Sequence, residues 1–198
     1  MNLTYVLASK SPRRRELLGQ LLGDLPFSVD PASGTEPAAA GLSPQAAVIR
    51  IARAKAEEVA VRHDGGTVVI AADTLVYLDG TPLGKPRDED DAKAMLRALS
   101  GRTHEVLTGV SVSLDGRFLD RCAVTQVTFR TLTEEEIARY IATGEPMDKA
   151  GAYGIQGRAG VMIESICGDY YNVVGLPLCM LWEMLRDLGA QPGQEGQA

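Results

Sequence analysis

The sequence predicts an α/β fold. Short apolar runs of strand length alternate with longer segments in which apolar residues recur at helical spacing. The chain has 198 residues, of which 45% are hydrophobic, enough for one large domain or two small lobes with a real core. No internal repeat or linker is evident. We therefore predict one domain over residues 1–190 and a flexible, Gly- and Gln-rich tail over 191–198.

The N-terminal half is expected to hold, in order, a strand over 5–8, a helix from residue 12, a strand over 27–29, a helix from 44 to about 62 and a strand over 67–72. Both helices begin with the same signal, a serine N-cap followed by proline at the first helical position: Ser11 and Pro12, then Ser43 and Pro44. The run over 67–72 is continuously apolar, which is typical of a central strand buried on both faces.

The C-terminal half is expected to hold a helix over 88–99, strands over 104–114 and 117–130, a helix after Thr133, a strand over 161–166 and a last helix over 176–188. Asp-Gly pairs at 79–80 and 115–116 indicate hairpin turns. Thr133 and Glu136 have the spacing of a capping box. Residues 144–160 are rich in glycine and small residues and are predicted to form a loop.

Composition restricts the classes of function and the compartment. The net charge of −6 argues against a nucleic-acid-binding protein, for which a basic face is expected. The three cysteines are far apart and form no metal or disulfide pattern, so we expect buried thiols in a reducing cytoplasm. The N-terminus enters a strand pattern directly, which predicts no signal peptide, and no apolar run is long enough to span a membrane.

The junction between the first strand and the first helix combines several donors for anions. Free backbone N–H groups at a helix start attract anions, Ser9 and Ser11 add hydroxyls, and Arg13 and Arg14 add guanidinium groups. This pattern indicates a phosphate cradle. The alternative is a capped helix with basic residues on its solvent face, because the segment matches neither a Walker A loop nor a dinucleotide fingerprint.

A carboxylate interrupts an apolar strand run at Asp73. A buried carboxylate is unfavourable unless it is paired, hydrogen-bonded or bound to a metal. Ligands of α/β sheets bind beyond the carboxyl ends of strands, so Asp73 is a candidate for metal ligation or water activation. The alternative is that Asp73 accepts hydrogen bonds from the backbone of a turn.

Four further side chains are weaker candidates. Lys85 lies between Gly84 and a proline that restricts its backbone, so its ammonium suits a polyphosphate. Gln156, in the Gly-rich segment, carries an amide that can recognise a base edge. Glu36 is a candidate metal ligand, and Lys55 a candidate phosphate ligand in an apolar helix. A solvated charge or a simple turn is the alternative in each case.

Together these candidates suggest hydrolysis of a nucleoside triphosphate. Cations and hydroxyls would hold the polyphosphate, one carboxylate would organise a divalent cation and an attacking water, and an amide would select a base. The two histidines, His63 and His104, are isolated and receive no role.

The same segments, in this order, resemble the Maf family of nucleotide pyrophosphatases over nearly the whole chain, residues 7–188. The motifs that carry the resemblance are Ser9-x-Ser11-Pro12-Arg13-Arg14, Ala72-Asp73-Thr74, Lys85-Pro86-Arg87-Asp88, Leu99-Ser100-Gly101-x-Thr103-His104, Asp148 to Gly157, and Val174-Gly175-Leu176-Pro177.

The resemblance implies a mixed central sheet flanked by helices, with two lobes around a cleft, as in the inosine triphosphate pyrophosphatases. It implies hydrolysis between the α and β phosphates with Mg²⁺ or Mn²⁺, and a homodimer is plausible. Asp73 aligns with the catalytic base and would also bind the metal with Glu36, while Lys85 would assist catalysis. The expected substrate-binding residues are Ser9, Ser11, Arg13, Arg14, Lys55, Thr74 and Gln156.

The resemblance extends to a subgroup. Members that act on dTTP and UTP carry Arg, Thr and Gln where this chain has Arg13, Thr74 and Gln156, whereas members that act on 7-methyl-GTP carry Trp, Gln and Glu. One residue departs from the dTTP/UTP pattern, because Gly84 stands where many such members have Glu. The family is also associated with inhibition of septum formation, so the competing hypothesis is a nucleotide-binding regulator that acts through a protein partner.

Overall fold

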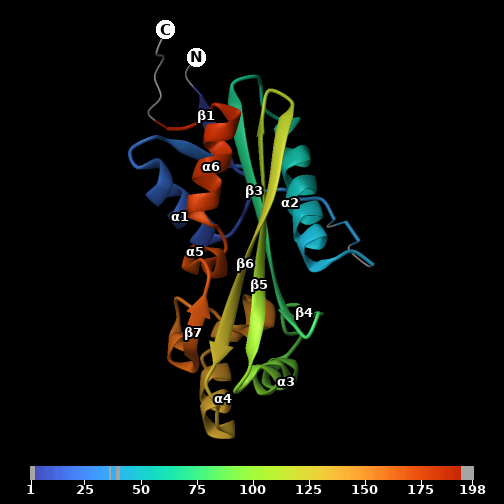
Figure 1. Ribbon diagram of the computed structural model, residues 1–198, viewed down its shortest axis with the longest axis vertical. Coiled ribbons are helices and arrows are strands. Elements are labelled where there is room, and N and C mark those ends of the chain that lie inside the picture. The colour runs from blue at the N-terminus through green and yellow to red at the C-terminus, as the bar shows by residue number, and fades with distance from the viewer. Residues whose placement is uncertain (1–2, 36, 39–40, 193–198) are drawn as a thin grey trace. The chain divides into compact units, whose positions relative to one another are not determined.

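The computed structural model describes residues 3–35, 37–38 and 41–192 (Figure 1). The strands are β1 Thr4–Leu7, β2 Phe27–Val29, β3 Thr67–Leu78, β4 Thr81–Leu83, β5 Thr103–Leu114, β6 Arg117–Phe129 and β7 Ile163–Cys167. The α-helices are α1 Pro12–Leu22, α2 Pro44–Ala60, α3 Glu89–Leu99, α4 Glu134–Ile141, α5 Tyr170–Val174 and α6 Leu178–Leu188. Three 3₁₀ turns are η1 Glu145–Asp148, η2 Ala150–Ala152 and η3 Arg158–Met162.

Within the described residues, seven strands form one sheet in the order β2-β1-β3-β5-β6-β7, and β4 pairs with β3. Strand β1 runs parallel to both β2 and β3, whereas β4 is antiparallel to β3 and β7 is antiparallel to β6. The predicted α/β class is confirmed, and the sheet is mixed as the family resemblance implied.

The predicted helix starts are confirmed by their caps. Ser11 accepts a hydrogen bond from the Arg14 N–H at 3.4 Å, and Ser43 accepts one from the Ala46 N–H at 3.3 Å. The capping box of α4 is complete, with both the side chain of Thr133 and that of its partner at N3 engaged. These starts were predictable because the donor and the acceptor lie within three residues of each other.

Three predicted boundaries were wrong. Strand β3 continues six residues beyond the predicted end at residue 72, because its far end pairs with β4 across the Asp79–Gly80 turn, whose φ angles are 50° and 75°. The last predicted helix is preceded by a separate short helix, α5, that the sequence did not indicate. The predicted loop over 144–160 contains two 3₁₀ turns and the start of a third, η3, which extends to Met162, so the strand predicted from 161 begins at Ile163.

The cysteines were also predicted incorrectly. Cys167 and Cys179 are exposed, and Cys122 is partly buried. Cys167 lies at the end of β7, and Cys179 lies in the first turn of α6 on a side that does not face the core. A strand or a helix can place a cysteine on its solvent side as readily as on its core side. The number and spacing of the cysteines therefore did not predict their burial.

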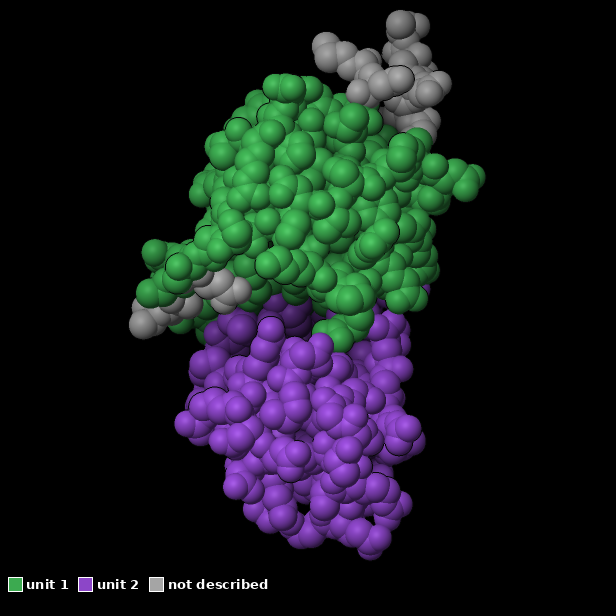
Figure 2. Space-filling model, turned by 180° about the vertical axis from the view of Figure 1, so that it is seen from behind, with its two compact units in different colours: residues 1–73, 108–123, 175–198 green, residues 74–107, 124–174 purple. Residues whose placement is uncertain are grey.

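The chain divides into two compact units (Figure 2). Unit 1 comprises residues 1–73, 108–123 and 175–198, and unit 2 comprises residues 74–107 and 124–174. The chain passes from one unit to the other within β3, β5 and β6, and again directly after α5. Two units agree with the lobes that the resemblance implied, and a single domain over 1–190 stays a prediction.

Each unit has its own apolar core. In unit 1, α2 packs on β1 and β3 through a cluster of small and β-branched residues: Val6, Ala8, Ala56, Val59, Val69 and Ala71. In unit 2, α3 and α4 pack with the far ends of β5 and β6 around fully buried Phe129, Leu96 and Leu99. Within the described part of the chain, no helix has both the length and the apolar character needed to cross a membrane. The predicted tail lies, from residue 193 on, outside the described residues.

A glycine in β5 lets α2 lie close to the sheet. A Cβ atom at Gly109 would overlap the carbonyl group of Val48 and would lie 2.7 Å from the backbone nitrogen of Ile49. Both neighbours are helix backbone, which cannot move aside as a flexible side chain can. The position of α2, and with it that of Lys55, therefore depends on the missing side chain.

We expect Gly109→Ala to lower the free energy of unfolding by about 3 kcal/mol or more, because the extra methyl forces helix and sheet apart. Urea denaturation measures the loss. Gly84→Ala is the control, since a Cβ there has nothing within 4 Å and should leave the midpoint nearly unchanged. Equal midpoints for wild type and Gly109→Ala would show that α2 does not depend on this contact.

Candidate active site

The loop between β1 and α1 forms a compact hydrogen-bonded cluster in unit 1. Ser9 is only 8% exposed, and its hydroxyl accepts from the Ser11 N–H at 3.2 Å and from Arg14 Nη1 at 3.3 Å. Arg14 Nε donates to the Gly175 carbonyl at 2.8 Å. The structure thus brings together Ser9, Ser11 and Arg14 at the start of α1. Arg13 precedes Arg14 in the same helical turn and is partly buried.

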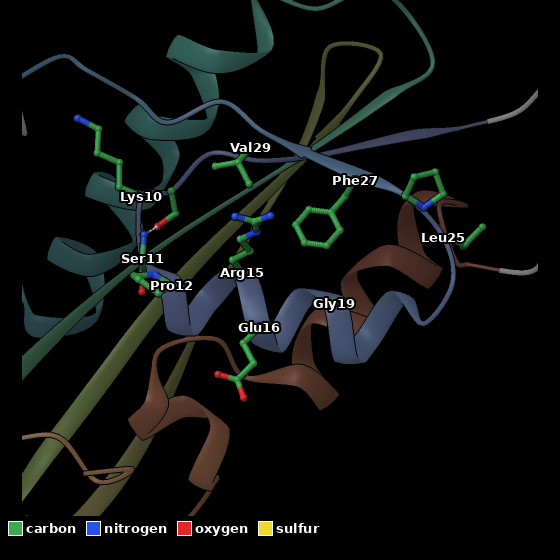
Figure 3. A pocket seen from close by; sticks show the side chains of 11 residues that line it. Lys10, Ser11, Pro12, Arg15, Glu16, Gly19, Leu25, Phe27 and Val29 are labelled. Carbon is green, nitrogen blue, oxygen red and sulfur yellow. Dashed lines mark hydrogen bonds between the residues drawn. The ribbon is translucent and has the colours of Figure 1, made fainter. Parts of the chain in front are cut away.

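Beside this loop a hollow of about 790 Å³ opens between α1 and β2 (Figure 3). Its walls carry both hydroxyls of the loop, the cations of Lys10 and Arg15, and the ring of Phe27. Phe27 lies over Gly19 of α1, where a Cβ atom would be 3.8 Å from the ring. The hollow therefore leaves this side of the loop between β1 and α1 open to small ligands.

Asp73 is buried inside β3 and paired with a lysine from α2. Lys55 Nζ donates to Asp73 Oδ1 at 2.7 Å, and their side chains are 21% and 12% exposed. The pairing explains how an apolar strand tolerates a carboxylate, and the alternative that Asp73 caps a turn is wrong, since it lies within the strand. Lys55, expected to bind phosphate, is held against the candidate catalytic carboxylate.

Three further candidates, Thr74, Lys85 and Gln156, belong to unit 2. Thr74 follows Asp73 in β3 and is partly buried, whereas Lys85 and Gln156 are exposed. The Gly151 N–H of η2 donates to the Gly84 carbonyl at 3.0 Å, so the Gly-rich segment is attached to the residue before Lys85. The proline after Lys85 is buried, which anchors the segment that presents the ammonium.

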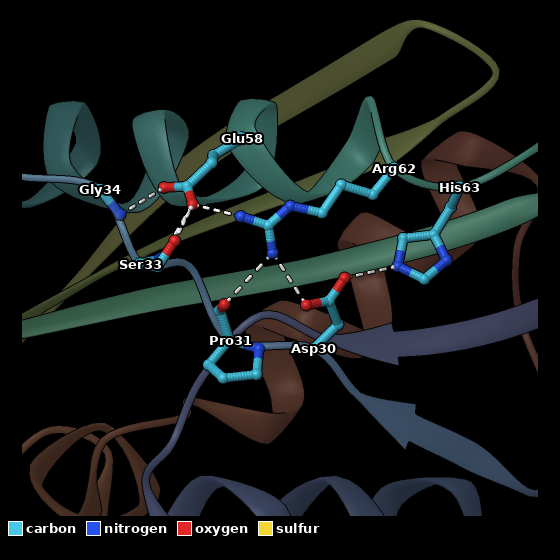
Figure 4. A network of polar contacts seen from close by, with 7 residues as sticks. All are labelled: Asp30, Pro31, Ser33, Gly34, Glu58, Arg62 and His63. Atoms are coloured by element: carbon cyan, nitrogen blue, oxygen red, sulfur yellow. Dashed lines mark hydrogen bonds and ion pairs between the residues drawn. The ribbon is translucent and has the colours of Figure 1, made fainter.

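Glu36 lies outside the described residues, but the loop that leads to it is well held. The Glu58 carboxylate of α2 accepts hydrogen bonds from the Ser33 and Gly34 N–H groups at 2.8 and 3.0 Å (Figure 4). These bonds lower the pKa of Glu58. Arg62 bridges Glu58 to Asp30, which in turn contacts His63, so this histidine has a structural partner.

The residues present fit one kind of metal site. Among the described residues, no three His, Cys, Asp or Glu side chains gather as a cage. Mg²⁺ in phosphate-transfer enzymes is commonly held by one or two carboxylates together with substrate phosphates. The single buried carboxylate of Asp73, in the unit that also carries the Ser9–Ser11–Arg14 loop, is compatible with that pattern.

Comparison with known proteins places the chain in a family. A family model described as Maf-like protein matches residues 4–188. The chain belongs to this family. A protein named dTTP/UTP pyrophosphatase from Thermococcus gammatolerans is 52% identical over 184 residues, which cover 93% of this chain and 96% of the relative. One of the same name from Anaeromyxobacter dehalogenans is 52% identical over 188 residues, which cover 93% of each chain.

The structure of this Maf-like protein also resembles a solved one. A HAM1 protein from Coxiella burnetii aligns with a TM-score of 0.53 at 16% identity, covering 94% of this chain and 100% of that chain. At this identity the similarity concerns the fold alone, and it confirms the fold that the motifs implied.

Three contacts of the site were not found from the sequence. The Gly175 carbonyl, which orients Arg14, is 161 residues away in the chain. The other two are the Gly84–Gly151 bond and the pairing of Lys55 with Asp73. The Val174-Gly175-Leu176-Pro177 motif was the only available signal for the first, and neither of the others has a local pattern.

We expect Lys55→Met to lower the free energy of unfolding by about 2 kcal/mol, because it leaves the Asp73 carboxylate buried without its cation while solvent still screens part of the charge. Chemical denaturation measures the change. Adding Asp73→Asn to Lys55→Met should restore part of the loss, since the two residues act as a pair.

Arg139→Met is the control for charge removal, because the Arg139–Glu135 pair has side chains 73% and 82% exposed and should contribute little. Additive effects of Lys55→Met and Asp73→Asn would show that the pair does not account for the tolerated carboxylate.

Proposed function

We propose that this protein hydrolyses dTTP and UTP to the nucleoside monophosphate and pyrophosphate. The observation that carries the proposal is the buried Lys55–Asp73 pair in the unit that also contains the hydrogen-bonded Ser9–Ser11–Arg14 loop. An anion-binding loop and a fixed carboxylate are the two components that water attack on a phosphate ester requires. Relatives at 52% identity that are named dTTP/UTP pyrophosphatase support it.

The triphosphate is bound mainly by unit 1. Arg13 and Arg14 provide guanidinium donors at the start of α1, and the hydroxyls of Ser9 and Ser11 add neutral donors. Lys55 has three N–H donors on one ammonium, so it can keep its bond to Asp73 and also donate to a phosphate oxygen. Lys85 of unit 2 adds a cation for the leaving pyrophosphate.

Asp73 activates the water. Lys55 fixes Oδ1 of the carboxylate, and the carboxylate accepts a proton from a water whose oxygen attacks the α phosphorus. The bond from the α phosphorus to the bridging oxygen breaks, and the electron pair leaves with pyrophosphate. Mg²⁺ or Mn²⁺, held by Asp73 with the substrate phosphates and with Glu36 as a second expected ligand, would neutralise charge on the phosphates.

Thr74 and Gln156 select the base. Their hydroxyl and amide can pair with the polar edge of thymine or uracil, and a wrong base would leave these groups unpaired. The Arg13, Thr74 and Gln156 pattern of the dTTP/UTP subgroup supports this substrate preference. Gly84, the one departure, has open space around it, so its lack of a side chain is not forced by packing.

Several parts of the proposal concern the protein in its cell. We propose a cytoplasmic enzyme that binds no nucleic acid and no membrane and that acts as a homodimer with a divalent cation. The alternative, a regulator of septum formation, is not favoured, because the curated relatives carry the name of a hydrolase. The two classes differ in whether purified protein consumes nucleotide.

We expect purified protein with Mg²⁺ or Mn²⁺ to release pyrophosphate from dTTP and UTP in preference to CTP, 7-methyl-GTP and purine triphosphates. Asp73→Asn should reduce turnover by about two orders of magnitude, because it keeps the shape of the side chain and removes the base. Glu135→Gln, which changes an exposed carboxylate on α4 whose partner is the exposed Arg139, is the control. Preference for 7-methyl-GTP would contradict the assignment to the dTTP/UTP subgroup. Near-normal turnover of Asp73→Asn would show that Asp73 is not the catalytic base, and intact nucleotide throughout would favour the regulator.

A further inference from the structure

The residue proposed to recognise the base lies in a short turn. Gln156 is exposed and lies between Gly154 and Gly157, and the Gly157 N–H closes the turn by donating to the Gly154 carbonyl at 3.0 Å. A turn of glycines and an exposed amide has little rigidity of its own. Selection between bases requires the Gln156 amide to be held in a fixed position, so contacts from outside the turn must hold it.

On the N-terminal side of the turn, Tyr153 is anchored in the core of unit 2. Its ring is 5% exposed and makes edge contacts with His104 at 5.3 Å and Phe129 at 4.9 Å between centroids. The Tyr153 hydroxyl and His104 Nε2 are 2.7 Å apart. Burial lowers the pKa of His104 to about 4 and raises the pKa of Tyr153, so a hydrogen bond between two neutral groups persists at physiological pH.

On the C-terminal side, a carboxylate holds the backbone just after the turn. Glu145 Oε2 accepts from the Arg158 N–H at 3.1 Å, and Glu145 Oε1 accepts from the Tyr140 hydroxyl at 3.0 Å. The fit is close, because a Cβ atom at Gly157 would overlap the Glu145 carboxylate, and one at Gly154 would be 2.7 Å from Lys149 Cε. The turn is therefore attached at both ends to buried or hydrogen-bonded groups.

The same segment also holds the neighbour of Lys85. Gly151, at φ 70°, donates its N–H to the Gly84 carbonyl, and a Cβ there would lie 3.1 Å from Val76. Ala152 also has a positive φ of 61°, which an alanine adopts only where surrounding contacts require it. The backbone from Gly151 to Tyr153 is thus fixed by packing rather than by its own preference.

We propose that His104, Tyr153 and Glu145 are positioning residues that hold the Gln156 turn from both sides and so set the base selectivity of the enzyme. We refer to the His104–Tyr153 and Glu145–Arg158 hydrogen bonds as the turn clamp. The inference rests on the proposed function, and it assigns a role to a histidine that the sequence left without one. Loosening the clamp should affect recognition of the base more than the chemistry at the α phosphorus.

Tyr153→Phe tests the clamp, since it removes one hydroxyl and keeps the ring. We expect the ratio of kcat/KM for dTTP to kcat/KM for CTP to fall about fivefold, as for the loss of one hydrogen bond. The change should lie mainly in the KM for dTTP, with kcat within about twofold of wild type. Glu145→Gln leaves one acceptor oxygen where the carboxylate accepts from both the Tyr140 hydroxyl and the Arg158 N–H, so it weakens the other half of the clamp and should move the same ratio in the same direction.

Tyr5→Phe is the matched control. Tyr5 is also 5% exposed, and its hydroxyl donates to the Ala190 carbonyl at 3.0 Å within unit 1. Both variants lose one buried tyrosine hydrogen bond, so their melting temperatures should fall by similar amounts. Only Tyr153→Phe should change selectivity, which a purely structural role would not do.

Gln156→Glu, measured on the same nucleotides, separates the clamp from the proposed function. Altered selectivity in Gln156→Glu with unchanged selectivity in both Tyr153→Phe and Glu145→Gln would overturn the clamp and leave the enzyme intact. An equal fall in selectivity for Tyr5→Phe would also overturn it. If wild-type protein hydrolyses no nucleotide, the proposed function fails and the clamp fails with it. Should Tyr153→Phe not fold, Glu145→Gln alone decides the outcome.

Discussion

A carboxylate inside a buried strand is the constraint on which unit 1 depends. Asp73 is 9% exposed within β3, and the strand tolerates the charge because α2 presents the Lys55 ammonium to it. That contact requires the helix to approach the sheet closely. Gly109 of β5 and a cluster of alanines between α2 and β1 make room for it. The small residues of this core thus allow close packing and also bring the Lys55 ammonium within reach of the Asp73 carboxylate.

The two units divide the proposed work by chemistry. Unit 1 carries the groups suited to a polyphosphate: hydroxyls, guanidinium groups and the lysine–carboxylate pair. Unit 2 carries an amide in a glycine-rich turn, and its surroundings are hydrogen bonds to the backbone and a buried histidine–tyrosine pair. Charged side chains are suited to the phosphates, which all nucleotides share. Neutral polar groups in fixed positions are suited to the base, which differs from one nucleotide to another.

Local chemistry made much of the fold predictable from the sequence. The starts of α1, α2 and α4 were found because an N-cap and its N–H partner lie within three residues. The Asp-Gly turns were found for the same reason. The candidate residues Ser9, Ser11 and Arg14 in the loop after β1 lie together as hydrogen-bonded neighbours, and their role in substrate binding stays a prediction.

Contacts between distant segments were not predictable in this way. The pairing of Lys55 with Asp73 depends on how a helix lies on a sheet, and the His104–Tyr153 bond joins residues 49 apart. Strand β3 was cut short at 72 because the polar pair that follows resembles a strand end, whereas pairing with β4 extends it. His104 was set aside as isolated in sequence, although it is buried against two aromatic rings.

The central claim is that the protein directs water to the α phosphorus of its substrate. Hydrolysis of dTTP by the purified protein in ¹⁸O-labelled water, with mass spectrometry of both products, tests it most directly. The account predicts one labelled oxygen in the nucleoside monophosphate and none in pyrophosphate. Label in pyrophosphate would place the attack on the β phosphorus, and release of orthophosphate with the nucleoside diphosphate would place the cleavage between the β and γ phosphates. Either result would contradict the account.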